Sequence, residues 1–179
     1  MRRLIQISAV TIGIFMLGLP VAKAQKVSAP DVPAAIEAPT GLDVVLLAHA
    51  SGWQIYSCQA GADSRFAWTL KAPDAELTDE KGKVIGRHFA GPAWRLNDGS
   101  EVTGKAAAHV DSPDASSIQW LLVNVVGHSG QGLLTSVTTI QRVRTHGGKP
   151  PAEGCDASQV NAETKSSYTA DYYFYAPAK

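Results

Sequence analysis

The sequence has 179 residues, of which 45% are hydrophobic, and its 16 basic residues balance its 16 acidic ones. No basic stripe runs along the chain, which argues against nucleic acid as a partner. The length is that of one ordinary domain once a leader segment is set aside.

The first residues are typical of a secretory signal peptide. A short positive region precedes an apolar run over residues 4–21, and Ala22-Lys23-Ala24 offers small residues where a signal peptidase cuts. A membrane anchor is the alternative, but Gly18 and Pro20 interrupt the apolar run. We predict a signal peptide over residues 1–24, export to the periplasm or out of the cell, and no membrane span after cleavage.

The segment that follows the leader, residues 25–40, contains three prolines and several alanines. This composition predicts an extended linker or an arm laid over the domain. Residues 41–50 are ambiguous between a short helix and a strand. Gly52 separates them from residues 53–59, whose alternation indicates a strand, so the two stretches are consistent with a hairpin.

Strand signals continue through the middle of the chain. Residues 66–71 predict a strand that Pro73 ends, and residues 83–90 predict another that Gly91-Pro92 ends. The dipeptide Asp98-Gly99 stands between two further apolar runs, and it predicts a hairpin because the turn needs a residue with positive φ.

A central hairpin is predicted next. Residues 118–126 are mainly apolar at both odd and even positions, as in a strand buried on both faces. A glycine-rich turn and a β-branched run over residues 133–143 follow. Residues 167–175 form a last strand of alternating aromatics. We therefore predict that residues 41–179 fold as a single all-β domain, an antiparallel β-sandwich or a closed β-barrel of about 8–10 short strands.

The only two cysteines, Cys58 and Cys155, lie in the mature part of the chain. An even pair in an exported protein predicts a disulfide, which would close a loop of nearly a hundred residues and contribute ~4–5 kcal/mol if unstrained. A redox or metal-binding thiol pair is the alternative, but neither cysteine lies in a C-x-x-C motif.

An ordered set of short blocks resembles a known family. The blocks are Gln54-Ile55-Tyr56-x-Cys58, Gly86-Arg87-His88-Phe89-Ala90-Gly91-Pro92-x-Trp94, Asp98-Gly99-Ser100, Trp120-Leu121-Leu122, Ile140-Gln141-Arg142-Val143, Gly147-Gly148, Gly154-Cys155-Asp156 and Tyr168-x-Ala170-Asp171-Tyr172-Tyr173-Phe174-Tyr175. The chain from about Thr40 to Tyr175 is similar to a family of small secreted bacterial and fungal proteins, catalogued as a domain of unknown function. The resemblance implies a compact exported domain and supplies no catalytic residues.

Three polar side chains are candidates for catalysis: His88, His128 and Arg142. His88 precedes a glycine-proline turn at a strand end, where functional groups often gather, and a half-buried structural histidine is the alternative. His128 lies in a glycine-rich turn that is neither a phosphate loop nor a nucleophile elbow, so a polar turn is the alternative. Arg142 interrupts an apolar strand and needs a partner when buried, which is either Asp171 or an anionic ligand.

Aromatic residues alternate along several predicted strands. Trp94, Trp120 and Tyr172 are candidates for the lining of a ligand cavity, and an ordinary core is the alternative. The five histidines show no metal-ligand spacing, so we expect no metal site and no cofactor. A site assembled across strands from His88, His128 and Asp171 is the alternative.

Three functions from different classes remain open. The first is an exported β-domain that binds a small ligand or a cell-envelope component. The second is an enzyme with His88 or His128 as general base and Arg142 steadying an anionic intermediate, and the third is a metal-binding periplasmic protein. The first is favoured because no nucleophile–base pair, acid pair or cofactor fingerprint is visible in the sequence.

Overall fold

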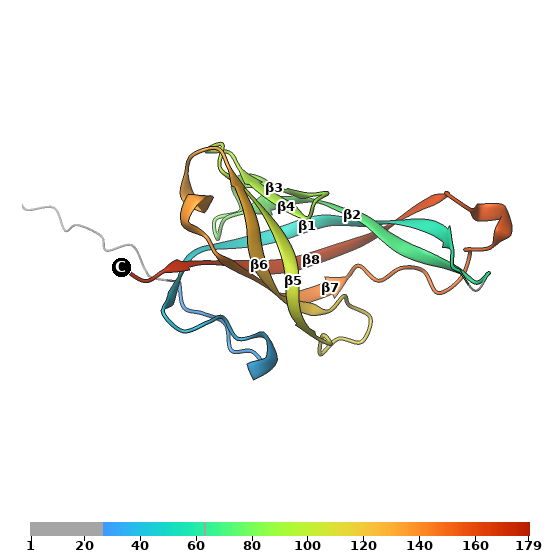
Figure 1. Cartoon of the computed structure of the whole chain (residues 1–179), viewed down its shortest axis with the longest axis horizontal. Helices are drawn as coiled ribbons and strands as arrows, with labels where there is room; N and C mark the ends of the chain where they lie inside the picture. Colours follow the sequence, from blue (N-terminus) through green and yellow to red (C-terminus); the bar gives the residue numbers. More distant parts are fainter. Residues whose placement is uncertain (1–26, 63) are drawn as a thin grey trace, which may run out of the picture.

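Eight antiparallel strands form one sheet that closes into a barrel in the computed structural model, which describes residues 27–62 and 64–179 (Figure 1). Each strand pairs with the next along the chain, and β8 pairs with β1. The all-β prediction is confirmed. Of the two architectures that the sequence left open, the structure has the closed barrel. The strands are β1 (Leu42–Ala60), β2 (Phe66–Thr78), β3 (Val84–Phe89), β4 (Ala93–Leu96), β5 (Glu101–Val110), β6 (Trp120–Ser129), β7 (Thr139–Gly147) and β8 (Glu163–Pro177).

Three short 3-10 turns complete the fold: η1 (Ala34–Ile36), η2 (Leu133–Ser136) and η3 (Ala157–Gln159). Among the described residues, no helix has the length and apolar character needed to cross a membrane. The predicted signal peptide over residues 1–24 lies outside the described residues.

The predicted break at Gly52 does not exist, because β1 runs without interruption through it. A Cβ atom at this position would stand 2.2 Å from the carbonyl oxygen of Asp74 on β2. The glycine therefore marks a close approach of two strands rather than a turn.

The predicted strand end at Pro73 is also wrong, since β2 continues to Thr78. The pairing of β2 with β3 stops at Ala75–His88, before it reaches the proline. Beyond that pair β2 has an unpaired side, and a residue without an N–H group is tolerated there.

The second strand of the predicted central hairpin begins later than expected. Leu133 and Leu134 belong to η2, and only the chain from Thr139 onward forms β7. The N–H of Leu133 donates to the Oδ2 atom of Asp98 (2.7 Å), and the N–H of Leu134 donates to the Oγ atom of Ser100 (3.2 Å). These bonds hold η2 against the β4–β5 turn, and the fully buried Leu134 closes one end of the barrel. That turn is the predicted Asp98-Gly99 hairpin, with Gly99 at positive φ.

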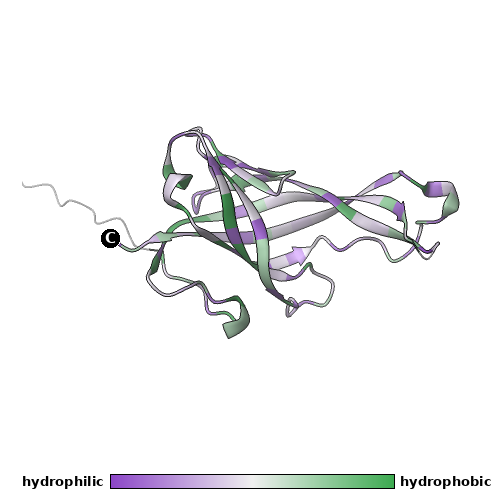
Figure 2. Cartoon of the chain, in the orientation of Figure 1, coloured by the Kyte–Doolittle hydropathy of each residue, from purple (hydrophilic) through white to green (hydrophobic). Residues whose placement is uncertain are grey.

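Two apolar cores lie on opposite faces of the sheet. One lies inside the barrel and includes Trp94, Ile140 and Phe174. The other lies outside the barrel, where residues 27–40 cover Tyr173 and Tyr175 with the buried side chain of Ile36. Figure 2 shows a nearly continuous apolar stretch in β6, as expected where side chains on both faces of a strand pack against a core.

The described part of the N-terminal arm is attached by a buried polar contact. The Nε2 atom of Gln141 donates to the carbonyl oxygen of Ile36 (2.6 Å), and the hydroxyl of Tyr175 donates to the Oε1 atom of the same glutamine. The arm therefore satisfies polar groups on the outer face of the barrel as well as covering apolar ones.

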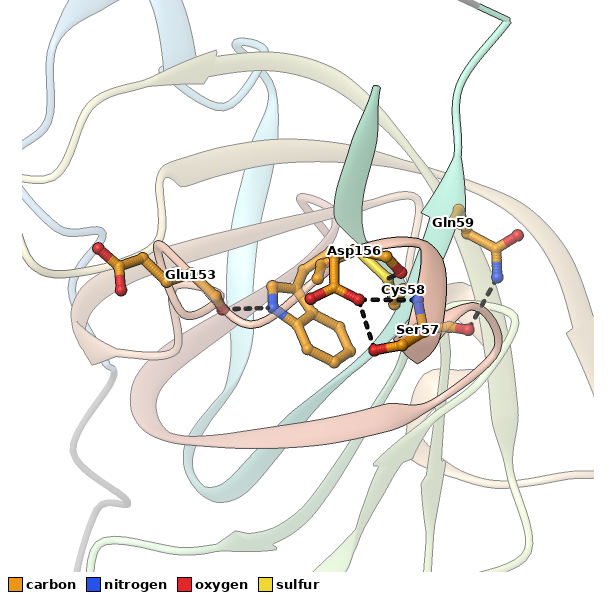
Figure 3. Close-up of a disulfide and its surroundings, with 8 residues drawn as sticks. Ser57, Cys58, Gln59, Glu153 and Asp156 are labelled. Atoms are coloured by element: carbon orange, nitrogen blue, oxygen red, sulfur yellow. Dashed lines mark hydrogen bonds between the residues drawn. A yellow bond between two sulfur atoms is a disulfide. The ribbon is translucent and has the colours of Figure 1, made fainter. Parts of the chain in front are cut away.

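The long strands β1, β2 and β8 extend beyond the other five (Figure 1). The Cys58–Cys155 disulfide, predicted from the sequence, joins this extension to the β7–β8 loop. Figure 3 shows Asp156 of that loop beside Cys58 of β1. The indole N–H of Trp68 on β2 donates to the Glu153 carbonyl oxygen (2.9 Å).

Candidate functional site

A cavity of about 540 Å³ occupies the barrel interior away from η2. Each of the eight strands contributes at least one residue to its wall. Exposed residues at its mouth include Leu70, Pro92 and Lys105, whereas Gln54 and His88 in its wall are buried. Because the cavity is closed on one side and open on the other, a small molecule can enter it from solvent.

Three rings form the aromatic wall of the cavity. The imidazole of His88 stacks on the indole of Trp94, with ring centroids 4.3 Å apart and planes 8° from parallel. Tyr172 approaches the same imidazole edge-on at 5.1 Å. Gly104 on β5 leaves room for this group, since a Cβ there would lie 3.0 Å from the indole of Trp94 and 2.5 Å from Val123.

His88 is held as a neutral side chain. Its Nδ1 atom lies 2.9 Å from the carbonyl oxygen of Ala93, and a carbonyl only accepts, so Nδ1 carries the proton. Burial, with a smaller contribution from the nearby charge of Arg142, lowers the pKa of His88 to about 3 despite the opposing effect of the Ala93 hydrogen bond. At neutral pH the Nε2 atom is therefore an unprotonated hydrogen-bond acceptor.

Arg142 brings a positive charge to the cavity wall. Its Nε and Nη2 atoms both donate to the carbonyl oxygen of Gln119, at 3.2 and 2.8 Å. It forms no ion pair with a carboxylate among residues 27–62 and 64–179. The half-buried guanidinium thus has the Gln119 carbonyl oxygen and the Tyr172 hydroxyl as partners, and no carboxylate counter-ion among the described residues.

The predicted partner of Arg142, Asp171, lies on the other face of the sheet. Its carboxylate accepts from Arg144 (3.0 Å) and contacts the Nδ1 atom of His49 (2.6 Å). Arg142 and Asp171 belong to strands that pair directly, but Asp171 alternates with the inward-facing Tyr172. A register shift between Val143 and His146 in β7 places Arg144 on the outer face, where it meets Asp171.

Two buried hydrogen-bonding groups in the cavity wall have no partner among the described residues. They are the Nε2 atom of Gln54 and the Nε1 atom of Trp94, on residues only 2% exposed. Such groups are uncommon in folded proteins because leaving each one unpaired costs about 1–3 kcal/mol. The hydroxyl of Tyr172 interacts instead with the hydroxyl of Tyr168 and with Arg142. Burial raises the pKa of Tyr168, and the proximity of Tyr172 raises it further.

Two other predicted site residues lie outside the cavity. The Nε2–H group of His128 donates to the carbonyl oxygen of Val137 (2.8 Å), after η2 at the closed end of the barrel. Trp120 packs with the outer core beneath the N-terminal arm. The structure therefore brings together His88, Arg142, Trp94 and Tyr172, and it separates His128 and Trp120 from them.

The described residues contain no group of three or more histidine, cysteine, aspartate or glutamate side chains arranged to hold a metal ion. His88, His128 and Asp171, the set considered from the sequence, occupy the cavity, the closed end and the outer face respectively.

Sequence reasoning missed Gln54, the most polar group in the buried wall. The sequence contained a signal for it, since Gln54, Tyr56 and Cys58 are alternate residues of one strand and therefore face the same side, where all three are buried. A polar residue on the apolar face of a strand is a candidate site residue, because burial without a partner is costly.

The comparison with protein families agrees with this architecture. The family described as "Protein of unknown function (DUF3455)" matches residues 39–176, which include almost all of the barrel from β1 to β8. Neither a curated protein nor a solved structure shows a significant match to the chain. Because the matched region is well over half of the sequence, the chain belongs to the DUF3455 family of proteins of unknown function.

Proposed function

We propose that the protein binds a small, largely apolar organic molecule inside the barrel. The observation that carries this proposal is that two unpaired buried donors, on Gln54 and Trp94, lie in the wall of one open cavity. A ligand with hydrogen-bond acceptors would satisfy these donors and offset the cost of their burial.

The size and lining of the cavity support the same function. Its volume of about 540 Å³ is within the range of small-molecule pockets, roughly 300–1,000 Å³. Its wall is mainly apolar and aromatic, with a few polar groups at defined positions, as in most ligand sites. Leu121 and Val123 provide the aliphatic part of this wall.

Binding is favoured over catalysis by the state of His88. A general base acts best when its pKa lies near the working pH, and the pKa of His88 is lowered to about 3. The described cavity lining also contains no serine, cysteine or carboxylate that would act as a nucleophile or acid. The imidazole is suited to accept a hydrogen bond from a ligand.

Export of the protein is part of the proposal. The Cys58–Cys155 disulfide supports it, because such bonds persist in oxidising compartments and are rare in the cytosol. The signal-like residues 1–24 support it from the sequence. The ligand would then be a molecule of the cell envelope or of the surroundings of the cell.

A neutral fluorescent probe tests the binding function. Phenylnaphthylamine is an uncharged dye that emits strongly in apolar surroundings, and we expect it to bind the oxidised protein at one site. Ala106 lines the cavity mouth, whereas its neighbour Ala107 does not. The Ala106→Trp variant should weaken dye binding by about tenfold or more, and the matched Ala107→Trp variant should bind as the wild type does. Absence of binding, or equal binding by both variants, would refute the proposal.

Native mass spectrometry of the exported protein provides an independent test. A mass excess that disappears on denaturation, and that is lower in Ala106→Trp than in Ala107→Trp, would show a co-purified ligand in the cavity. Its mass would also limit the chemical identity of that ligand.

A further inference from the structure

We propose, on the basis of the binding function above, that the natural ligand is an organic monoanion whose single acidic group binds Arg142. Three features of the described residues support it: the positive charge of the cavity, the direction of its hydrogen bonds, and its single half-buried cation.

The cavity has an excess of positive charge. Arg142 and Lys105 contribute to its lining, and no aspartate or glutamate does. An arginine keeps its proton at all ordinary pH values, so it cannot become neutral to avoid the cost of partial burial. With Gln119 supplying only a carbonyl oxygen, a ligand anion is the missing counter-ion.

The charge of Arg142 acts on the tyrosines of the cavity wall. It lowers the pKa of Tyr172 and of Tyr168 against the larger effect of burial, which raises both. Arg142 and Tyr172 are directly paired residues of β7 and β8 and line the same cavity. An acidic group bound to the guanidinium would therefore lie within reach of the Tyr172 hydroxyl.

The unpaired cavity groups require a ligand that accepts hydrogen bonds. The amide nitrogen of Gln54 and the indole nitrogen of Trp94 only donate. Charged oxygen atoms are the strongest acceptors for such donors. A cationic ligand would meet repulsion from Arg142 and would leave the same donors unpaired.

A ligand with one acidic group matches the single half-buried cation of the cavity wall. Arg142 is half-buried, whereas Lys105 is exposed at the mouth, where solvent and salt screen its charge. The apolar body of the ligand would occupy the space between Leu121, Val123 and the aromatic wall.

The test compares two dyes with the same ring system. Anilinonaphthalenesulfonate is phenylnaphthylamine with one added sulfonate group, so the difference in their affinities isolates the charge. We expect wild-type protein to bind the sulfonate about tenfold more tightly or better. In Arg142→Gln this preference should vanish while the affinity for the neutral dye is kept, and in Arg142→Lys, which retains the charge, part of the preference should return.

Arg95→Gln is the matched control, since Arg95 pairs with Glu101 on the outer face of the barrel and does not line the cavity. It should leave both affinities unchanged. If wild-type protein binds both dyes equally, or if Arg142→Gln weakens both to the same degree, the monoanion proposal is refuted while the binding function stands. If neither dye binds, the binding function itself fails and the monoanion proposal with it.

Discussion

The neutral, buried His88 makes the protein sensitive to acid in a way that can be measured. Burial lowers the pKa of His88 from its ordinary 6.5 to about 3 in the folded protein. Between these two pH values the unfolded chain binds one more proton at this position than the folded chain does. Acidification therefore favours the unfolded state, and the stabilisation is complete above about pH 6.5 and lost as the pH falls toward about 3.

The magnitude follows from the two pKa values. Each pH unit between them corresponds to about 1.4 kcal/mol, so the full loss below about pH 3 is about 5 kcal/mol. By the same linkage, the loss relative to neutral pH is about 1 kcal/mol at about pH 5.5 and about 3 kcal/mol at about pH 4.5.

The His88→Phe variant removes this titration while keeping a ring to stack on Trp94. It also leaves the Ala93 carbonyl oxygen unpaired, a cost that does not depend on pH. Urea unfolding of both proteins without ligand, at about pH 7.5, 5.5 and 4.5, measures the difference in their free energies of unfolding. Carboxylates titrate in both proteins, so their contribution cancels in this difference.

We expect the free energy of unfolding of wild type, minus that of His88→Phe, to fall by about 3 kcal/mol between about pH 7.5 and 4.5. A difference that stays constant across this range would show that His88 is accessible to protons in the folded state. The assignment of a neutral imidazole to the cavity wall would then be refuted.

Three further changes test the framework around the cavity. Replacing Cys58 and Cys155 with serine should lower the free energy of unfolding by about 4–5 kcal/mol, because a loop of nearly a hundred residues is released, and a loss below about 1 kcal/mol in urea titrations would contradict this. Gly52→Ala should cost about 1–3 kcal/mol in thermal unfolding, since its Cβ would stand 2.2 Å from a backbone oxygen of β2; an unchanged melting temperature would exclude that close approach. Gln141→Leu should speed hydrogen exchange in residues 27–40 while the barrel strands stay protected, because the carbonyl of Ile36 loses its donor; unchanged exchange would mean that apolar packing alone holds the arm.

The local pattern of residues predicted most of the strands, and its errors have common causes. Gly52 and Pro73 are turn formers by composition, yet both lie inside strands. Their effect depends on the neighbouring strand: Gly52 allows β2 to approach closely, and Pro73 lies where β3 has already ended. Leu133 and Leu134 are residues that are common in strands, but their N–H groups donate hydrogen bonds to side chains of the β4–β5 turn, which is distant in sequence.

The candidate site was predicted only in part, because the inward face of a strand also depends on its neighbours in the fold. His88, Trp94, Arg142 and Tyr172 were chosen individually, and the structure places all four around one cavity. Trp120 was chosen on the same grounds, but it faces the outer core instead. Alternation along one strand shows that neighbouring residues face opposite ways without showing which way is inward.

Residue patterns were enough to predict the all-β class, the pairing of the only two cysteines, the family, and the side chains with the chemistry to form a site. Those properties depend on composition, short-range alternation and the count of thiols. The patterns could not show that the sheet closes, that Arg142 faces inward without a carboxylate partner among the described residues, or that Asp171 pairs with Arg144 outside. These outcomes depend on the register between strands far apart in the chain, and a shift such as that between Val143 and His146 moves a side chain to the opposite face of the barrel.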